Sequence, residues 1–108
     1  MKRELTNTET GILTIRSYSK DLTKKPGVYK MLDNNKNILY IGKAKNLFNR
    51  VKSYTNLNNH TYRIKKMISE TRSMEFTITG TEAEALLLEA NLIKKNKPKY
   101  NIAMRDDK

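Results

Sequence analysis

Two similar tripeptides set the strongest limit on how this chain can fold. Gly-Val-Tyr at 27–29 and Tyr-Ile-Gly at 40–42 are separated by ten residues, and each lies in an apolar stretch suited to a β-strand. The segment 33–37, Asp-Asn-Asn-Lys-Asn, lies between them and is rich in residues that tolerate left-handed backbone and bond their own main chain. The pattern therefore predicts a β-hairpin that brings Tyr29 and Tyr40 close together.

Hydrophobic periodicity and capping residues predict the remaining elements. We expect strands at 28–32, 38–41 and 74–79, and helices that begin near Asn46, span about 60–71, and run from Thr81 to about Asn96. In the last helix, Thr81 and Glu84 form a capping box, and Pro98 ends the helix. Because this helix is apolar on almost every side, we expect it to be the central, buried helix.

These elements indicate an α+β fold, in which helices flank a small three-stranded antiparallel sheet. The length of 108 residues indicates one domain. Residues 1–10 are polar and lack periodicity, so we expect them to be poorly ordered, and residues 11–25 have no clear assignment. We therefore divide the chain into a partly ordered amino-terminal extension, 1–25, and a domain at 26–108.

The charge balance indicates a polyanionic partner. The chain has 22 Lys and Arg residues against 11 Asp and Glu residues, a formal net charge of +11. Such a surface favours nucleic acid, because each neutralised phosphate releases condensed counterions. Charge alone indicates binding and not catalysis. The lack of cysteine excludes disulfides and Cys-ligated zinc, and without a long apolar run we expect neither a signal peptide nor a membrane span.

The basic residues form two groups. Those around the first predicted helix are Lys43, Lys45, Arg50 and Lys52, and those at the end of the last predicted helix are Lys94, Lys95, Lys97 and Lys99. Such runs usually form a solvated face, but the large net charge favours a surface that follows phosphates. We therefore expect six lysines to bind DNA: Lys45, Lys52, Lys94, Lys95, Lys97 and Lys99.

Glu89 is the first candidate for chemistry. Its neighbours on the predicted helix are apolar, among them Ala85, Leu92 and Ile93. A carboxylate on such a surface is costly to bury unless it is paired or binds a cation. The alternative is a half-exposed glutamate at the helix edge, or one bridged to an arginine.

The two hairpin tyrosines are the second candidate. Tyrosines in strands usually pack and hydrogen-bond through the hydroxyl, which is the alternative to a catalytic role. Lys43 and Arg50 lie close in sequence, and nearby cations favour the phenolate and lower the pKa of a tyrosine. A shift of two units from about 10 would give a usable base at neutral pH. His60 has no second histidine or paired carboxylate nearby, so we do not expect it to bind metal.

These residues together resemble the GIY-YIG nuclease superfamily. The similarity consists of the two hairpin tripeptides, a helical Arg50, Glu89 in a later helix and Asn101 beyond it. Within the superfamily, the stretches LYIGKAKNLFNRVKSY and TEAEALLLEANLIKKNKPKYNIAMRDDK resemble the amino-terminal domain of the UvrC family of bacterial excision-repair endonucleases. The resemblance covers about 26–108 and implies the GIY-YIG fold.

The resemblance also implies roles for individual residues. Tyr40 would be the general base for water, with Tyr29 bonded near it, and Arg50 would contact the scissile phosphate. Glu89 would hold one divalent metal, Mg²⁺ or Mn²⁺. The further active-site positions would be Lys43, Tyr54 and Asn101. Few other carboxylates are placed for a central site, which favours one metal over a two-metal clamp.

The function that we expect is a metal-dependent DNA endonuclease domain that hydrolyses one strand, as the 3′ incision of nucleotide excision repair. The resemblance implies damaged duplex DNA as substrate and the other excision-repair subunits as partners, through parts of a full-length chain absent here. It implies a monomer in the bacterial cytosol or nucleoid. The alternatives are a GIY-YIG nuclease with a restriction, homing or stand-alone repair duty, and a non-catalytic nucleic-acid-binding module.

Overall fold

The predicted hairpin is present and supplies two of the three strands of the sheet. β1 (Gly27–Leu32) pairs antiparallel with β2 (Ile38–Ala44) and, on its other side, with β3 (Ser73–Ile78), so the strand order is β2-β1-β3. The structure is a computed structural model and describes residues 4–104. The predicted α+β class, with helices flanking a small antiparallel sheet, is confirmed.

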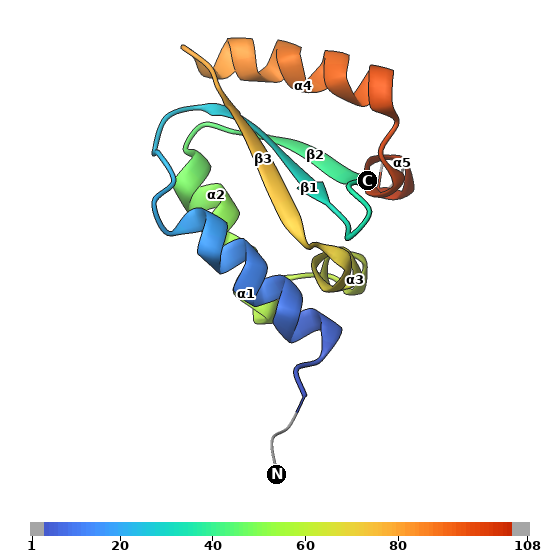
Figure 1. Cartoon of the computed structure of the whole chain (residues 1–108). Coiled ribbons are helices and arrows are strands. Elements are labelled where there is room, and N and C mark those ends of the chain that lie inside the picture. The colour runs from blue at the N-terminus through green and yellow to red at the C-terminus, as the bar shows by residue number, and fades with distance from the viewer. Residues whose placement is uncertain (1–3, 105–108) are drawn as a thin grey trace.

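Helices cover both faces of this sheet (Figure 1). They are α1 (Asn7–Ser19), α2 (Leu47–Ser53), α3 (Tyr62–Glu70), α4 (Glu82–Asn96) and α5 (Lys99–Met104), with a short 3₁₀ turn, η1 (Leu57–Asn59). One face carries α1, α2 and α3, while α4 lies over β1 and β2 on the other face and α5 contacts β2. Within residues 4–104, no helix has the length and apolar character needed to cross a membrane.

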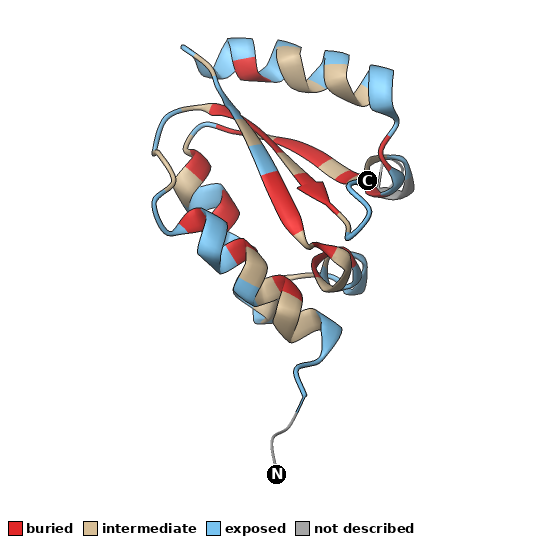
Figure 2. Ribbon diagram, viewed as in Figure 1, coloured by how far each residue is buried: buried red, intermediate tan, exposed pale blue. Residues whose placement is uncertain are grey.

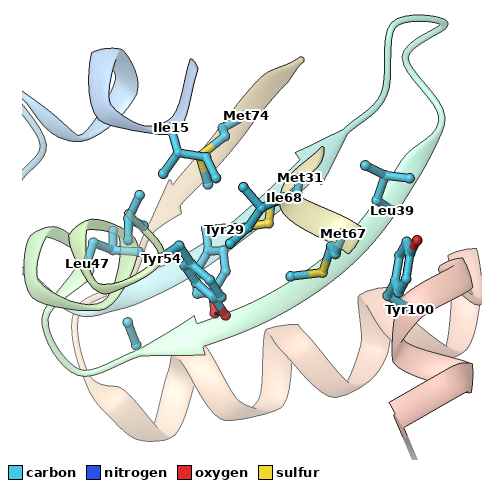
Figure 3. Close-up of a cluster of buried hydrophobic side chains, with 12 residues drawn as sticks. Ile15, Tyr29, Met31, Leu39, Leu47, Tyr54, Met67, Ile68, Met74 and Tyr100 are labelled. Atoms are coloured by element: carbon cyan, nitrogen blue, oxygen red, sulfur yellow. Dashed lines mark hydrogen bonds between the residues drawn. The ribbon is translucent and has the colours of Figure 1, made fainter. Parts of the chain in front are cut away.

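Buried residues lie on both sides of the sheet (Figure 2). They form two hydrophobic clusters of unequal size. The larger cluster lies under α1, α2 and α3, and its side chains include Ile15, Tyr29, Met31, Leu47, Val51, Tyr54, Met67 and Ile68 (Figure 3). The smaller cluster joins Val28 and Ile41 of the sheet to Ala85 of α4. Most of the buried apolar area, and with it most of the hydrophobic stabilisation, therefore lies on the α1–α3 face.

A β-bulge changes which residues of β2 reach the larger cluster. Met31 pairs with Tyr40, but the next pair is Leu32 with Ile38, so Leu39 is an extra residue on β2. Ile38 packs with the smaller cluster under α4, whereas Leu39 and Tyr40 both pack against the larger one. The bulge thus places two consecutive side chains on one face, of which Tyr40 lies beside Tyr29, and such irregularities are common beside active sites.

The turn between β1 and β2 is closed by its own side chains. The Asp33 carboxylate accepts hydrogen bonds from the backbone N–H groups of Asn35 and Asn37, each at 2.9 Å. These bonds, the one from Asn37 first, lower the pKa of Asp33. Lys36 is the residue in the left-handed region, with φ of 66°. The predicted use of left-handed backbone is confirmed, although a lysine and not an asparagine adopts it.

The expectation that residues 7–10 are poorly ordered is wrong, because α1 begins there. Thr6 caps the helix in a reciprocal capping box, in which its hydroxyl accepts from Glu9 N–H at 3.1 Å and the Glu9 carboxylate accepts from Thr6 N–H at 2.9 Å. Ile15 of the same helix is fully buried in the larger cluster. The polar character of this segment reflects a capped helix start and not a flexible end. The division of the chain at residue 25 stays a prediction.

The expectation that the last helix is central and buried is also wrong. Thr81 is the N-cap as predicted, since its hydroxyl accepts from Glu84 N–H at 3.1 Å, but the predicted capping box is only half formed, because the Glu84 carboxylate accepts from the Thr81 hydroxyl at 3.3 Å instead of from its backbone N–H. In α4, however, Ala85 is the buried residue, while Leu86 and Leu87 are 54% and 65% exposed. The helix covers a sheet of three strands from outside, so nothing described packs against its outer face and its apolar residues there remain exposed.

Candidate active site

Three tyrosines from three elements meet at one end of the larger cluster. Tyr29 comes from β1, Tyr40 from β2, and Tyr54 from the C-cap of α2. The hydroxyls of Tyr29 and Tyr54 are 2.6 Å apart (Figure 3), and the ring centroid of Tyr29 lies 6.2 Å from that of Tyr40. The predicted proximity of Tyr29 and Tyr40 is confirmed, and Tyr54 joins them.

The glycine of the second tripeptide makes room for this cluster. Gly42 pairs with Tyr29 across the two strands. A Cβ atom at Gly42 would lie 2.4 Å from both the Cζ atom and the hydroxyl oxygen of Tyr29, which is closer than real Cβ atoms approach. Gly42 therefore allows the Tyr29 phenol to lie flat over the strand, with its oxygen in reach of Tyr54.

Arg50 links the tyrosines to the surface. It lies on α2, whose start is fixed by the Asn46 side chain accepting from Asn49 N–H at 3.0 Å. Arg50 Nε donates to the Tyr29 hydroxyl at 3.3 Å, and its guanidinium carbon lies 5.2 Å from the centre of the Tyr54 ring. Interaction with Tyr29 is the main cause of a raised pKa for Arg50, so this side chain stays positively charged.

Arg50 also lines a basic hollow on the surface beside the tyrosines. The hollow has a volume of about 400 Å³, and its walls are formed by Lys43, Ala44, Lys45, Asn46, Asn49, Arg50 and Ser53. The lining has three cationic side chains and no acidic one. We call it the α2 hollow. Its size and charge suit a phosphate group.

The prediction that nearby cations lower the pKa of the hairpin tyrosines is wrong for both Tyr29 and Tyr40. Burial raises the pKa of Tyr40 to about 12, Tyr54 adds to the rise, and Arg50 only partly offsets it. Burial likewise raises the pKa of Tyr29 well above its ordinary value. Desolvation of the charged form outweighs a single partly exposed guanidinium. Both phenols are therefore neutral at pH 7.

Glu89 lies on the inner side of α4 and faces β2. It is half-buried, and burial raises the pKa of its carboxyl, while a hydrogen bond from the Lys43 backbone and the Lys43 charge oppose the rise. Electrostatic interaction with Glu89 contributes to the raised pKa of Tyr40. Within residues 4–104, no lysine or arginine side chain forms an ion pair with Glu89. The predicted alternative of a glutamate bridged to an arginine does not hold there.

This environment fits a bound divalent cation. A half-buried carboxylate with a raised pKa is one whose negative charge is incompletely compensated. Among the described residues, no group of three His, Cys, Asp or Glu side chains could hold a metal, so they form no carboxylate-rich cage around Glu89. Asp106 and Asp107, which the sequence placed at the end of the chain, lie outside the described residues. The donor set therefore suits one hard cation that keeps most of its water ligands, such as Mg²⁺.

Lys43 and Asn101 have defined contacts near these residues. Lys43 Nζ lies 4.0 Å from a carboxylate oxygen of Glu82. Asn101 accepts from the backbone N–H of Ile41 and donates to the backbone C=O of Ile41, each at 2.8 Å. Its amide is thus bonded to the residue next to Tyr40. Asn101 therefore positions β2, and through it Tyr40.

The six lysines expected to bind DNA lie in different places. Lys45 lines the α2 hollow, and Lys52 lies on the opposite side of α2, with its ammonium 5.4 Å from the Phe48 ring. Lys94 and Lys97 line a second hollow of about 630 Å³ next to α5, and Lys95 is exposed. Lys99 is paired with Glu70 at 3.2 Å. The six lysines are thus divided among three hollows and other exposed positions, and Lys99 already has an acidic partner.

His60 belongs to the site, which sequence reasoning missed. Its ring stacks on Tyr54 with centroids 5.6 Å apart and planes at 17°, and its Nε2 lies 2.7 Å from the Ser53 carbonyl oxygen. The η1 turn, capped by Asn56, brings His60 back over the end of α2. No periodicity signals such a return, so the histidine looked isolated in a polar loop.

The sequence of this chain is similar to those of known proteins. A family model described as the UvrC-like GIY-YIG domain matches residues 25–102. The chain is 55% identical over 98 residues to UvrABC system protein C of Bartonella quintana, and 57% identical over 99 residues to that of Ruegeria sp.. These matches cover 91% and 92% of this chain but only 14% and 15% of the relatives, so the chain spans about a seventh of their length.

A solved structure is similar as well. It is the GIY-YIG N-terminal endonuclease domain of UvrC from Thermotoga maritima, bound to its catalytic divalent cation, magnesium. The match has 42% sequence identity and a TM-score of 0.73, and it covers 81% of this chain and 94% of that one. The predicted resemblance and fold are confirmed: this chain belongs to the UvrC-like GIY-YIG domain family.

Proposed function

We propose that this chain is a metal-dependent DNA endonuclease domain that hydrolyses a phosphodiester bond in one strand. The observation that carries the proposal is the meeting of a charged Arg50, the neutral Tyr40 and the half-buried Glu89 beside the basic α2 hollow. A binding module has no need of a half-buried carboxylate whose charge is incompletely compensated, which argues against the non-catalytic alternative.

In this proposal Arg50 holds the scissile phosphate in the α2 hollow. Its charge is fixed, because its contacts with Tyr29 and the Tyr54 ring hold the guanidinium before substrate arrives. Such preorganised charge stabilises the negative charge that builds on the phosphoryl oxygens in the transition state. Lys43 and Lys45 on the same hollow add positive potential, and Asn101 keeps β2 in place.

Tyr40 is the proposed acceptor of the proton from the attacking water, a role that requires its phenolate form. Its pKa of about 12 leaves most molecules neutral at pH 7, so the phenol first orients the water through a hydrogen bond and must release its own proton to solvent before it accepts one from the water. The Tyr29–Tyr54–Arg50 contacts hold the ring next to it in position. His60, stacked on Tyr54, supports the outer end of this arrangement.

Glu89 is the proposed protein ligand of one divalent cation, Mg²⁺ by analogy with the T. maritima domain and Mn²⁺ as a substitute. Such a cation would supply Lewis-acid stabilisation of charge on the phosphate and the leaving oxygen. A cation next to the phenol would also oppose the effect of burial on the Tyr40 pKa.

The wider duty that we propose is the 3′ incision of nucleotide excision repair in the bacterial cytosol. The curated relatives are UvrABC system proteins of which this chain covers about a seventh, so recognition of damaged duplex DNA and contact with the other subunits would require further parts of such a protein. By itself we expect the domain to be a monomer. A GIY-YIG nuclease of another duty is the second candidate.

Nicking of supercoiled plasmid tests the proposed activity. The wild-type chain should relax the plasmid with Mg²⁺ or Mn²⁺ and not with EDTA. Glu89→Gln should stop nicking while the melting temperature and the DNA affinity in EDTA change little, because the variant removes the charge and keeps the shape. Glu75→Gln, at an exposed position of β3, is the matched control and should nick at the wild-type rate. Nicking by Glu89→Gln at near the wild-type rate would refute the metal assignment.

A further inference from the structure

Helix α2 has a groove on each side. The α2 hollow lies on the side of Arg50 and Ser53. On the other side, a groove of about 540 Å³ separates α2 from α1, and its walls are formed by Leu13, Arg16, Ser17, Ser19, Lys20, Phe48, Lys52 and Thr55. We call this the α1–α2 groove. Its α1 wall precedes the residues that the family model matches, 25–102.

The rim of the α1–α2 groove carries uncompensated positive charge. Arg16, Lys20 and Lys52 line it, and no acidic residue does. None of the three forms an ion pair with an acidic side chain in the part of the chain that the structure describes. The apolar part of the groove lining is formed by Leu13 and Phe48. Cations beside apolar and aromatic side chains match the sugar–phosphate backbone of a nucleic acid, which has charged phosphates and a less polar sugar edge.

The orientation of α2 keeps the two grooves apart. Leu47, Val51 and Tyr54 are buried, which fixes the rotation of the helix about its axis. Arg50 is thereby turned to one groove and Lys52 to the other. An α-helix with its side chains is about 10–12 Å across. The major groove of B-DNA is about 12 Å wide. Two phosphate-binding surfaces on opposite sides of one helix therefore have the separation of the two strands that border a major groove.

We propose that the α1–α2 groove binds the backbone of the uncut strand of duplex DNA, while the cut strand lies in the α2 hollow. The assignment rests on the proposed function, because it takes the α2 hollow as the cleavage site. Charge complementarity selects DNA over a protein partner, which would need a strongly acidic segment to fit this rim. In this arrangement α1 is a duplex-binding element, and Arg16 and Lys20 contact phosphates of the strand that is not hydrolysed.

Salt-dependent binding tests the proposal. Affinities for a duplex and for one of its strands are measured in EDTA by fluorescence anisotropy at several salt concentrations. Each lost phosphate contact lowers the slope of log affinity against log salt by about 0.9 on duplex DNA. Arg16→Gln with Lys20→Gln should therefore flatten the duplex slope by up to about 2 and leave the single-strand slope unchanged. The matched control, Lys65→Gln with Lys66→Gln on exposed positions of α3, should change neither slope.

Each other outcome overturns the proposal. An unchanged duplex slope would show that the groove does not bind phosphates, and equal flattening on both substrates would show that it binds the strand common to both. Thermal melting confirms that the variants are folded. Plasmid nicking by the wild-type chain is measured beside them. If nicking requires Glu89 but the Arg16/Lys20 variant has a normal duplex slope, only the groove assignment fails; if the wild-type chain does not nick, the proposed function fails.

Discussion

Removal of the Tyr40 hydroxyl is the most informative perturbation of the site. Tyr40→Phe takes away one oxygen and keeps the ring that packs against Tyr29. If Tyr40 accepts the proton from water, the variant should lose about 10² to 10⁴ in nicking rate. Tyr62→Phe is the matched control, because Tyr62 is 77% exposed and loses the same atom away from the site.

The pH dependence follows from the burial of Tyr40. With a pKa of about 12, Tyr40 is phenolate in about one molecule in 10⁵ at pH 7 and about one in 10³ at pH 9. A phenolate base therefore predicts that the single-turnover nicking rate rises tenfold per pH unit across this range, and that the rise ends at the pKa of Tyr40 in the complex. A cation that lowers this pKa moves the end of the rise to lower pH.

Single-turnover nicking from pH 6.5 to 9.5, in Mg²⁺ and in Mn²⁺, separates a phenolate base from a hydroxide base. If a hydroxide is the base, Tyr40→Phe keeps the slope and loses little rate. If the phenolate is the base, the variant loses both the rate and the slope. Tyr40→Phe within about threefold of wild type, with the same pH profile, would refute the assignment and make Tyr40 a packing residue.

Three further outcomes follow from the structure. Gly42→Ala should displace the Tyr29 phenol, which lies too close for a Cβ atom at residue 42, and should destabilise the fold by about 1–3 kcal/mol as measured by urea unfolding. The nicking rate should fall by a larger factor than this loss of stability explains. Unchanged stability would show that the ring moves freely. The Tyr40 pKa is higher in the folded chain than the ordinary value of about 10, so its contribution to stability is complete below pH 10 and is lost as pH rises through 12, by up to about 3 kcal/mol. Urea unfolding at pH 8 and pH 11.5 should show this loss, and Tyr40→Phe should reduce it. Lys97 ends α4 with φ of 45°, in the left-handed region that favours glycine, so Lys97→Gly should raise the free energy of unfolding by up to about 1 kcal/mol. If Lys97 binds a phosphate, the variant's slope of log affinity against log salt on duplex DNA should be about 0.9 smaller than that of wild type.

Local signals in the sequence predicted local structure well. The hairpin follows from a turn segment between apolar stretches, and α4 follows from the Thr81 N-cap and Pro98, so both are found where expected. The proximity of Tyr29 and Tyr40 needs only antiparallel pairing. Glu89 stood out because its helical neighbours are apolar, and it is half-buried, which is also what the alternative of a half-exposed glutamate at the helix edge predicts.

Properties that depend on the surrounding chain were not predictable in this way. Whether α4 is covered on one face or on all depends on what packs against it, and its composition does not contain that information. The direction of the Tyr40 pKa shift is set by burial, which raises the pKa by more than the Arg50 charge lowers it. The sequence shows that Arg50 is close along the chain, but it does not show how deeply Tyr40 is buried. His60 reaches Tyr54 through an irregular turn, which has no periodic signal.

The Asn101 side chain has a consequence for association between copies of the chain. β2 is an outer strand of the sheet, so the backbone groups of Ile41 that face away from β1 could pair with a strand from another molecule. The Asn101 amide satisfies both the N–H and the C=O of Ile41, much as a neighbouring strand would. The carboxyl-terminal helix thus blocks edge-to-edge strand addition at the residue beside Tyr40. Loss of this amide in Asn101→Ala leaves that edge available for intermolecular β-pairing, so the variant should aggregate at lower protein concentration than wild type.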